Sequence, residues 1–88
     1  MVIEFNRRFL KDLDKITRAS VKKDISGIID EVKTAGTLSE IKNLKKLKGY
    51  STAYRIRIGD YRVGLFFENN IVEFVRVVDR KDIYNVFP

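Results

Sequence analysis

The feature that most constrains this chain is a predicted β-hairpin centred on Gly59-Asp60. Apolar and polar residues alternate on both sides of this dipeptide, which is typical of half-buried β-strands. Glycine suits the first position of a two-residue type II′ turn, because it adopts a positive φ without strain. Such a turn also fixes the register of the two strands. The predicted opposite pairs are Ile58 with Tyr61, Arg57 with Arg62, Ile56 with Val63, and Tyr54 with Leu65.

The alternation gives this hairpin one apolar face and one basic face. The apolar face would carry Tyr54, Ile56, Ile58, Tyr61, Val63 and Leu65. The basic face would carry Arg55, Arg57 and Arg62. Like charges directly opposite each other destabilise a sheet by about 0.2–1 kcal/mol, and a face that only had to be soluble would mix the two signs. Three arginines on one open face therefore indicate a binding site for a polyanion.

Charge and composition narrow the possible partners and chemistry. The 88 residues carry 18 Lys and Arg against 12 Asp and Glu, so the net charge of +6 favours nucleic acid, an anionic membrane surface or an acidic protein. The absence of Cys and His excludes a disulfide framework, a thiolate nucleophile and an imidazole base. We expect no metal and no cofactor. Without an apolar run of membrane-spanning length, we expect one cytoplasmic domain covering residues 1–88.

The first half of the chain predicts a strand followed by two helices. Residues 2–5 form a short alternating or edge strand, and Asn6 is a candidate N-cap. The apolar positions of the first helix are Phe9, Leu10, Leu13 and Ile16, and those of the second helix are Val21, Ile25, Ile28, Ile29 and Val32. The capping box from Thr37 to Glu40 predicts a helical turn, and residues 42–48 then cross back to the hairpin.

The second half predicts a three-stranded antiparallel meander. The second strand of the hairpin continues to Phe67, Asn69-Asn70 is a type I′ turn signal, and the last strand covers residues 71–78. This register would place Arg76 opposite Val63 on the apolar face. Two explanations remain open, namely a β-bulge that redirects the strand or an uncovered sheet edge at Arg76. Residues 79–84 follow as a turn or short helix.

This order of elements predicts an α+β fold: an N-terminal strand, a helical hairpin and the meander, with the helices on one side of the sheet. The order and the arginine pattern resemble the RelE/ParE superfamily of bacterial and archaeal toxins. The resemblance is greatest to the RelE branch, the ribosome-dependent messenger-RNA interferases. The motifs that carry it are Leu-Lys-Gly at 47–49, Tyr-Arg-Ile-Arg-Ile-Gly-Asp-Tyr-Arg-Val at 54–63, and Arg-Lys-Asp-Ile-Tyr at 80–84.

The resemblance implies the toxin of a type II toxin-antitoxin system. Such a toxin is an endoribonuclease that cleaves messenger RNA in the ribosomal A site by metal-independent attack of the 2′-hydroxyl on the phosphate. By position, the catalytic residues would be Arg57, Arg62, Arg80 and Tyr84, and the RNA-binding residues would be Arg55, Lys45, Lys46 and Lys48. Some relatives have lysine in place of Arg55 and Arg57, or histidine in place of Asp79, so the general base stays unassigned.

The resemblance also implies the partners. These are a small acidic or amphipathic antitoxin, the ribosome and messenger RNA, with no membrane partner. We expect the toxin to be monomeric alone and hetero-oligomeric with its antitoxin.

Other interpretations remain open. The chain could be a ParE-like toxin that binds and poisons DNA gyrase without nuclease activity, or a degenerate relative that only binds nucleic acid. ParE toxins generally lack the full set of basic residues and tyrosine, which favours the nuclease. Arg80 could instead form a surface salt bridge with Asp79 or Asp82, worth less than about 1 kcal/mol. Tyr84 and Phe87 could simply anchor the tail to the core.

Overall fold

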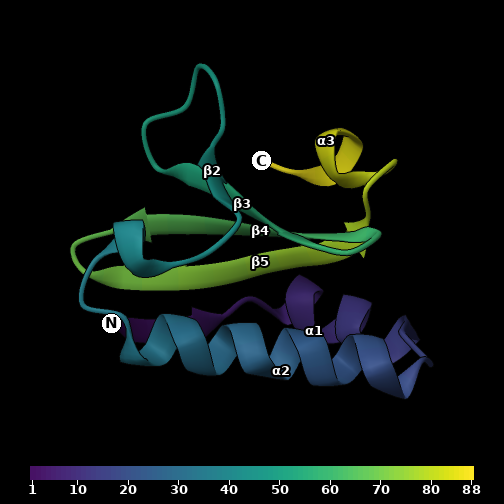
Figure 1. The fold of residues 1–88 in the computed structure, drawn as a ribbon. Helices are drawn as coiled ribbons and strands as arrows, with labels where there is room; N and C mark the ends of the chain where they lie inside the picture. The colour runs from purple at the N-terminus through teal and green to yellow at the C-terminus, as the bar shows by residue number, and fades with distance from the viewer.

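The computed structural model describes all 88 residues and contains a five-stranded sheet in the order β1-β5-β4-β3-β2 (Figure 1). β1 is parallel to β5, and all other neighbouring strands are antiparallel. The elements are β1 (Val2–Phe5), α1 (Arg7–Lys15), α2 (Ala19–Thr34), the 3-10 helix η1 (Leu38–Glu40), β2 (Leu44–Lys46), β3 (Ala53–Ile58), β4 (Tyr61–Glu68), β5 (Ile71–Asp79) and α3 (Ile83–Val86). The predicted α+β fold is confirmed.

The central hairpin of β3 and β4 has the predicted register. Arg57 lies opposite Arg62 and Ile56 lies opposite Val63, while Gly59 in the turn has a φ of +55°. The next turn, Asn69-Asn70, has two positive φ values, as a type I′ turn requires. Local turn chemistry therefore sets the pairing of three consecutive strands.

β2 is a strand that the sequence did not predict. The chain was expected only to cross back over residues 42–48, but Leu44–Lys46 pairs with the outer edge of β3. Asn43, with a φ of +63°, precedes it. Three residues carry too little periodicity to indicate a strand, and the pairing arises from the unpaired edge that β3 offers.

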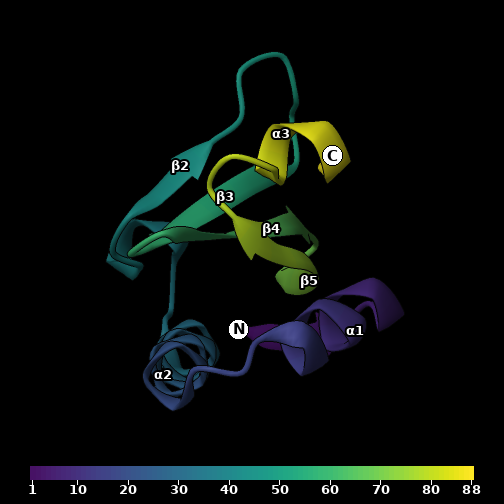
Figure 2. The same cartoon turned by 90° about the vertical axis from the view of Figure 1, so that its right-hand side faces the viewer.

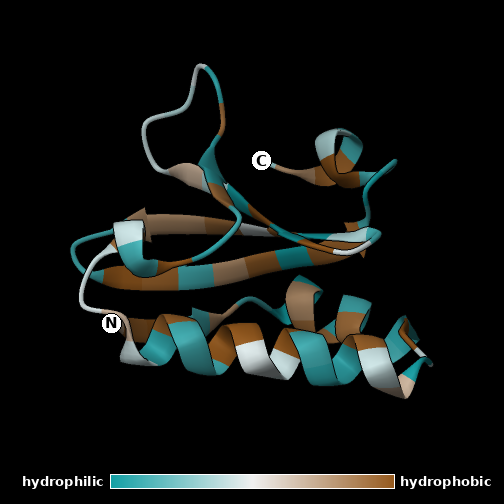
Figure 3. Ribbon diagram, viewed as in Figure 1, coloured by the Kyte–Doolittle hydropathy of each residue, from teal (hydrophilic) through white to brown (hydrophobic).

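α1 and α2 cover one face of the sheet, as predicted (Figure 2). The Asn6 side chain caps α1 by accepting a hydrogen bond from the Arg8 backbone N–H at 2.9 Å. Phe9, Ile25 and Val32 are fully buried, and hydrophobic residues recur along α2 on the side toward the sheet (Figure 3). Leu10 is an exception among the predicted apolar positions, because 47% of it is exposed. No helix of the structure has the length and apolarity needed to cross a bilayer.

Both explanations offered for Arg76 hold at once. Gly64 pairs with Arg76 but Leu65 pairs with Phe74, so Val75 is a bulge and Val77 takes the position on the helix-covered face. β1 covers the edge of β5 only as far as Phe74, which leaves the edge at Arg76 open.

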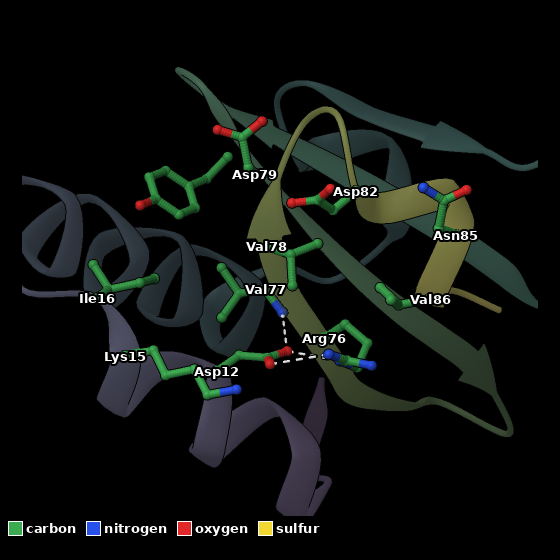
Figure 4. Close-up of a pocket in the computed structure, with 11 residues that line it drawn as sticks. Asp12, Lys15, Ile16, Arg76, Val77, Val78, Asp79, Asp82, Asn85 and Val86 are labelled. Atoms are coloured by element: carbon green, nitrogen blue, oxygen red, sulfur yellow. Dashed lines mark hydrogen bonds and ion pairs between the residues drawn. The ribbon is translucent and has the colours of Figure 1, made fainter.

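α1 closes this open edge with a carboxylate. Asp12 accepts from Arg76 at 2.7 and 3.1 Å and from the Val77 backbone N–H at 3.1 Å (Figure 4). These hydrogen bonds raise the pKa of Arg76 above its usual value. Asp12 is only 6% exposed, and its pair with Arg76 is the one ion pair of the structure.

A second, smaller core lies on the opposite face of the sheet, beneath the C-terminal segment. It consists of Leu47, Ala53, Val75, Ile83 and Phe87. The Phe87 ring packs against Phe66 with centroids 5.1 Å apart and lies directly over Gly64. α3 therefore lies on the other side of the sheet from α1 and α2 (Figure 1). Phe87 anchors the tail to the core, as one of the alternative interpretations held.

We predict that Gly64→Ala destabilises the protein, because the new Cβ would lie 2.6 Å from ring atoms of Phe87. The free energy of unfolding should fall by about 1–3 kcal/mol, as for other overpacked positions. The matched control is Gly27→Ala in α2, where nothing lies within 4 Å of the new Cβ. This change should raise stability by about 0.5–1 kcal/mol. Denaturant unfolding measures the free energy of unfolding of both variants. Equal changes in Gly64→Ala and Gly27→Ala would contradict the close approach of Phe87 to Gly64.

We also predict that Asp12→Ala lowers the free energy of unfolding by about 3 kcal/mol, because it leaves Arg76 without its buried partner and the Val77 N–H unsatisfied. The control is Asp14→Ala on the same helix, an exposed residue outside the ion pair, which should change stability by no more than about 0.5 kcal/mol. The double variant Asp12→Leu/Arg76→Met should recover much of the stability. If Asp12→Ala and Asp14→Ala lower the free energy of unfolding equally, the Asp12–Arg76 ion pair does not stabilise the open edge of β5.

Candidate nucleic-acid interface

The arginines of the hairpin lie on the face of the sheet that α1 and α2 leave open. Arg57 and Arg62 are direct neighbours across β3 and β4, and Arg55 pairs across with Gly64. On the outer side, Lys45 of β2 lies opposite Arg55. Opposite residues of an antiparallel pair point to the same face, so four cations come from three adjacent strands.

Asn43 orients two of these arginines. Its backbone carbonyl accepts from Arg55 Nη1 at 2.9 Å and from the Arg57 backbone N–H at 3.2 Å. Its side-chain Oδ1 accepts from Arg57 Nη2 at 3.3 Å. Sequence reasoning missed this residue; the signal available was an asparagine, one of the few residue types that tolerate the left-handed region, just before β2.

Arg62 lies at the centre of the positive charge. Its Nη1 donates to the carbonyls of Gly59 at 2.8 Å and Tyr61 at 3.0 Å. Partial burial lowers the pKa of its guanidinium below the usual value. The positive charges of Arg55, Arg57 and Arg80 lower the pKa further, and Tyr84 acts in the opposite direction. An anion beside Arg62 would relieve this repulsion.

The C-terminal segment brings Arg80 and Tyr84 to this cluster. The Arg80 backbone N–H donates to the Asp60 carbonyl at 2.8 Å, which ties the segment to the hairpin turn. Arg80 forms no salt bridge with Asp79 or Asp82. Tyr84 is 65% exposed and so does not anchor the tail.

The three lysines expected to bind RNA are placed differently from one another. Lys45 shares the open face with Arg55, whereas the register puts Lys46 opposite Tyr54 and so on the other face of β2. Lys48 is exposed just after that strand. Even so, a hollow of about 400 Å³ is lined by Lys45, Lys46, Leu47, Lys48 and Tyr84. Tyr84 therefore lies close to these lysines as well as to Arg62.

No carboxylate lies within 4.0 Å of these cations, since the structure has only the Asp12–Arg76 ion pair. The nearest acidic residue in sequence to Arg80, Asp79, instead accepts from the Lys81 backbone N–H at 2.9 Å. No group of three acidic side chains lies close enough together to hold a metal ion. We call Arg55, Arg57, Arg62, Arg80 and Tyr84 the arginine site. Its arrangement suits binding of a single-stranded polyanion with an aromatic ring available for stacking.

Another hollow of about 400 Å³ lies beside the bulge, between α1, β5 and α3 (Figure 4). It is lined by Lys15, Tyr61, Asp79 and Asp82 among others, together with the Asp12–Arg76 pair. Cations and carboxylates are mixed there, and Asp12 is fully engaged by Arg76 and Val77. This hollow lacks the single sign of charge that distinguishes the arginine site.

Comparison with known proteins gives the family. Residues 3–84 match the model of a family described as the ParE toxin of type II toxin-antitoxin system, parDE. The chain is also 39% identical over 89 residues to the toxin RelE3 of Methanocaldococcus jannaschii, covering 100% of both chains. The chain belongs to the RelE/ParE toxin superfamily. Its full-length likeness to RelE3 supports the RelE branch, so it is a toxin of the RelBE type of toxin-antitoxin system.

Solved structures agree with this assignment. The RelB-RelE antitoxin-toxin complex from Methanococcus jannaschii contains a chain that matches with a TM-score of 0.81 and 38% identity, covering 97% of this chain and 99% of that one. A chain of the intact E. coli RelBE toxin-antitoxin complex matches with a TM-score of 0.70 and 22% identity, covering 89% and 94%. The second match concerns the fold alone. The resemblance inferred from the sequence is therefore confirmed at the level of family and fold.

We predict that the arginine site weakens the folded state through repulsion. Added salt should raise the free energy of unfolding of the wild-type protein, because it screens the like charges around Arg62. Arg62→Ala should melt at the same or a higher temperature than wild type and should gain less from salt. The control Lys33→Ala, on the last turn of α2, should keep the wild-type salt dependence. If added salt raises the free energy of unfolding of wild type and of Arg62→Ala by the same amount, repulsion around Arg62 does not destabilise the protein.

Proposed function

We propose that this toxin is an endoribonuclease that cleaves messenger RNA in the ribosomal A site. The observation that carries the proposal is the arginine site itself. Its arginines meet on one open face beside an exposed tyrosine, and no carboxylate neutralises them. The arginines of this site repel one another, and no carboxylate offsets their charge. A ligand with several phosphates would neutralise them.

The reaction would use the RNA's own 2′-hydroxyl as nucleophile. The 2′-oxygen loses its proton and attacks the adjacent phosphorus, the bond from phosphorus to the 5′-oxygen breaks, and that oxygen leaves with a proton. The products are a 2′,3′-cyclic phosphate and a 5′-hydroxyl. Negative charge grows on the phosphoryl oxygens in the transition state, so fixed positive charge near them lowers the barrier.

Within this reaction Arg62 and Arg80 clamp the reacting phosphate. Each guanidinium offers two parallel N–H groups that match two phosphoryl oxygens. Arg57 and Arg55 hold the flanking phosphates, with Asn43 fixing their orientation. Tyr84 stacks on an unstacked base or takes part in proton transfer, and its exposure leaves the ring accessible for either role.

The ribosome supplies what this site lacks. The chain has no histidine or cysteine to tune as a base, and a guanidinium group has no acceptor with which to take up a proton. A scaffold that holds the messenger with its 2′-oxygen in line with the leaving oxygen removes a large entropic barrier. We therefore propose slow cleavage of free RNA and fast cleavage of ribosome-bound messenger, in the cytoplasm.

The proposal includes the partners of the toxin. Lys45, Lys46 and Lys48, around the hollow beside Tyr84, bind RNA phosphates near the arginine site. A small acidic or amphipathic antitoxin silences the toxin, which is monomeric when alone. Two of the related structures are RelB-RelE and RelBE complexes, which supports a hetero-oligomer here as well.

We predict that Arg62→Ala and Arg80→Ala each abolish growth arrest while the protein stays folded. Loss of one charge that stabilises the transition state lowers kcat by about 10²-fold or more. Growth after induction and thermal melting are measured side by side, with Lys33→Ala as the control that should stay toxic. Undiminished toxicity in both arginine variants would remove them from the site. Loss of toxicity through unfolding would make them structural.

The cleavage itself is mapped by primer extension on cellular messages after induction. In-frame cuts in translated messages that persist with a chelator in a purified translation reaction agree with the proposal. Efficient chelator-sensitive cutting of naked RNA would contradict the proposed mechanism. Intact messages together with broken DNA would favour the ParE-like alternative, in which the chain poisons gyrase.

A further inference from the structure

Two aromatic side chains of this protein are more than half exposed, and the proposed function uses only one of them. Tyr84 belongs to the arginine site, whereas Tyr50, which is 52% exposed, lies in the loop between β2 and β3. A single exposed aromatic residue is common on protein surfaces and needs no explanation by itself. Tyr50 is distinguished by two further features, namely the turn that holds it and the cations that lie close to it.

A tight turn fixes the position of Tyr50. Its backbone N–H donates to the Leu47 carbonyl at 3.2 Å, and Gly49 between them has a φ of +85°, as the third residue of a type II turn does. Leu47 is buried in the second core together with Ile83 of α3, and its N–H donates to the Ala53 carbonyl at 2.9 Å. The turn and α3 are therefore anchored in the same core and lie side by side (Figure 1, Figure 2). A ligand at Tyr50 would meet a backbone that is already ordered, which lowers the entropic cost of binding.

Tyr50 also lies close to a concentration of positive charge. The hollow of about 400 Å³ beside Tyr84 is lined by Lys45, Lys46, Leu47, Lys48 and Tyr84. Leu47 and Lys48 are the first two residues of the turn that ends at Tyr50. The first and last Cα atoms of a β-turn are less than about 7 Å apart, so Tyr50 lies close to this hollow. No carboxylate lines the hollow, and none forms an ion pair with its lysines.

This combination of residues suits single-stranded nucleic acid. Proteins that bind a single strand contact its phosphates with cations and stack its bases on aromatic rings. The hollow offers both, since its lysines lie close to two exposed tyrosine rings. A protein partner fits less well, because protein interfaces contain few lysines and have apolar residues at their centre. The one aliphatic residue of the β2–β3 loop, Leu47, is buried and so is not available to such a partner.

We propose that Tyr50 is a second base-stacking residue of this toxin, which binds a messenger nucleotide beyond the one that contacts Tyr84. The bound strand runs from the arginine site past Tyr84 and over the lysines of the hollow to Tyr50. Its phosphates contact the lysines, and one of its bases stacks on the Tyr50 ring. Every base has a π-face, so Tyr50 contributes affinity and not a codon preference. This inference rests on the proposed function, because it takes the bound polyanion to be single-stranded RNA.

The test measures binding of an RNA strand that cannot be cleaved. The probe is a single-stranded oligonucleotide of about eight 2′-O-methyl ribonucleotides, which lacks a free 2′-hydroxyl, titrated at several salt concentrations. Tyr50→Ala should weaken binding by roughly 5- to 150-fold, the range for loss of one base–aromatic contact. Tyr50→Phe should restore the affinity, because stacking needs the ring and not the hydroxyl. The matched control is Ser51→Ala, the exposed neighbour in the same loop, which should bind as wild type does.

The salt dependence separates stacking from charge. Tyr50→Ala removes no charge, so the slope of log K against log salt should equal that of wild type. Lys48→Gln should instead reduce the magnitude of this slope by about 0.7, the value for one phosphate contact on a single strand. The melting temperature of Tyr50→Ala should be unchanged, because the ring is exposed in the folded protein.

A fluorescent variant reports the stacking directly. The chain has no tryptophan, so Tyr50→Trp introduces a single one. Its emission should be quenched by the oligonucleotide and unaffected by an abasic chain with the same number of phosphates. Equal responses to the two chains would show that no base stacks at this position and would overturn the inference.

The outcomes distinguish this inference from the proposed function. Wild-type RNA affinity in Tyr50→Ala, with weaker binding by Arg62→Ala, would overturn the inference and leave the proposed function intact. Weaker binding of Tyr50→Ala to the purified antitoxin alone would also overturn it, because Tyr50 would then be a protein contact. If Arg62→Ala stays toxic while Tyr50→Ala binds the oligonucleotide more weakly, the proposed nuclease function fails and the stacking role of Tyr50 stands. If wild type does not bind the oligonucleotide at low salt, both proposals fail.

Discussion

The contact on which the arginine site depends is that of the Phe87 ring with Gly64. Because Gly64 has no side chain, the ring lies directly on the backbone of β4 and holds the C-terminal segment against the open face. Together with the hydrogen bond from Arg80 to Asp60, this contact carries Arg80 and Tyr84 to a hairpin that precedes them in the chain by a whole strand and two turns. The open face is thus divided into an apolar part under the tail and a basic part that remains accessible.

Local rules account for the parts of the fold that the sequence predicted. The Gly59-Asp60 and Asn69-Asn70 turns set the strand register through two residues each. The Asn6 side chain caps α1 by a hydrogen bond from a backbone N–H only two positions later. What sequence reasoning missed depends on residues far apart. Asp12 meets Arg76 across 64 positions, and the strand β2 exists only because β3 offers an edge. No periodicity in either segment reports the presence of the other.

The candidate site divides in the same way. The strand period and the register set by the Gly59-Asp60 turn predicted that Arg55, Arg57 and Arg62 share one face, whereas Arg80 and Tyr84 were added by family resemblance. The structure brings the two groups close enough for the charge of Arg80 to lower the pKa of Arg62. Asn43 escaped notice because its two acceptor oxygens contact arginines 12 and 14 positions later in the chain, whereas its residue type indicates only that it tolerates the left-handed region. For the contact of Phe87 with Gly64, the only indication in the sequence was a glycine in the interior of β4, which often marks a close approach of another group to the backbone.

If the arginine site binds a polyanion as proposed, repulsion among its unpaired cations links the stability of the protein to that binding. A polyanion that binds only the folded state stabilises it by RT ln(1 + [L]/Kd), and here part of that energy is relief of strain already present around Arg62. Salt therefore acts in two opposite directions. It stabilises the free toxin by screening its arginines, and it weakens a complex whose affinity comes from phosphate contacts. An antitoxin that supplies carboxylates to the same face would exploit the same strain, so one cluster of charge can serve both toxicity and its control.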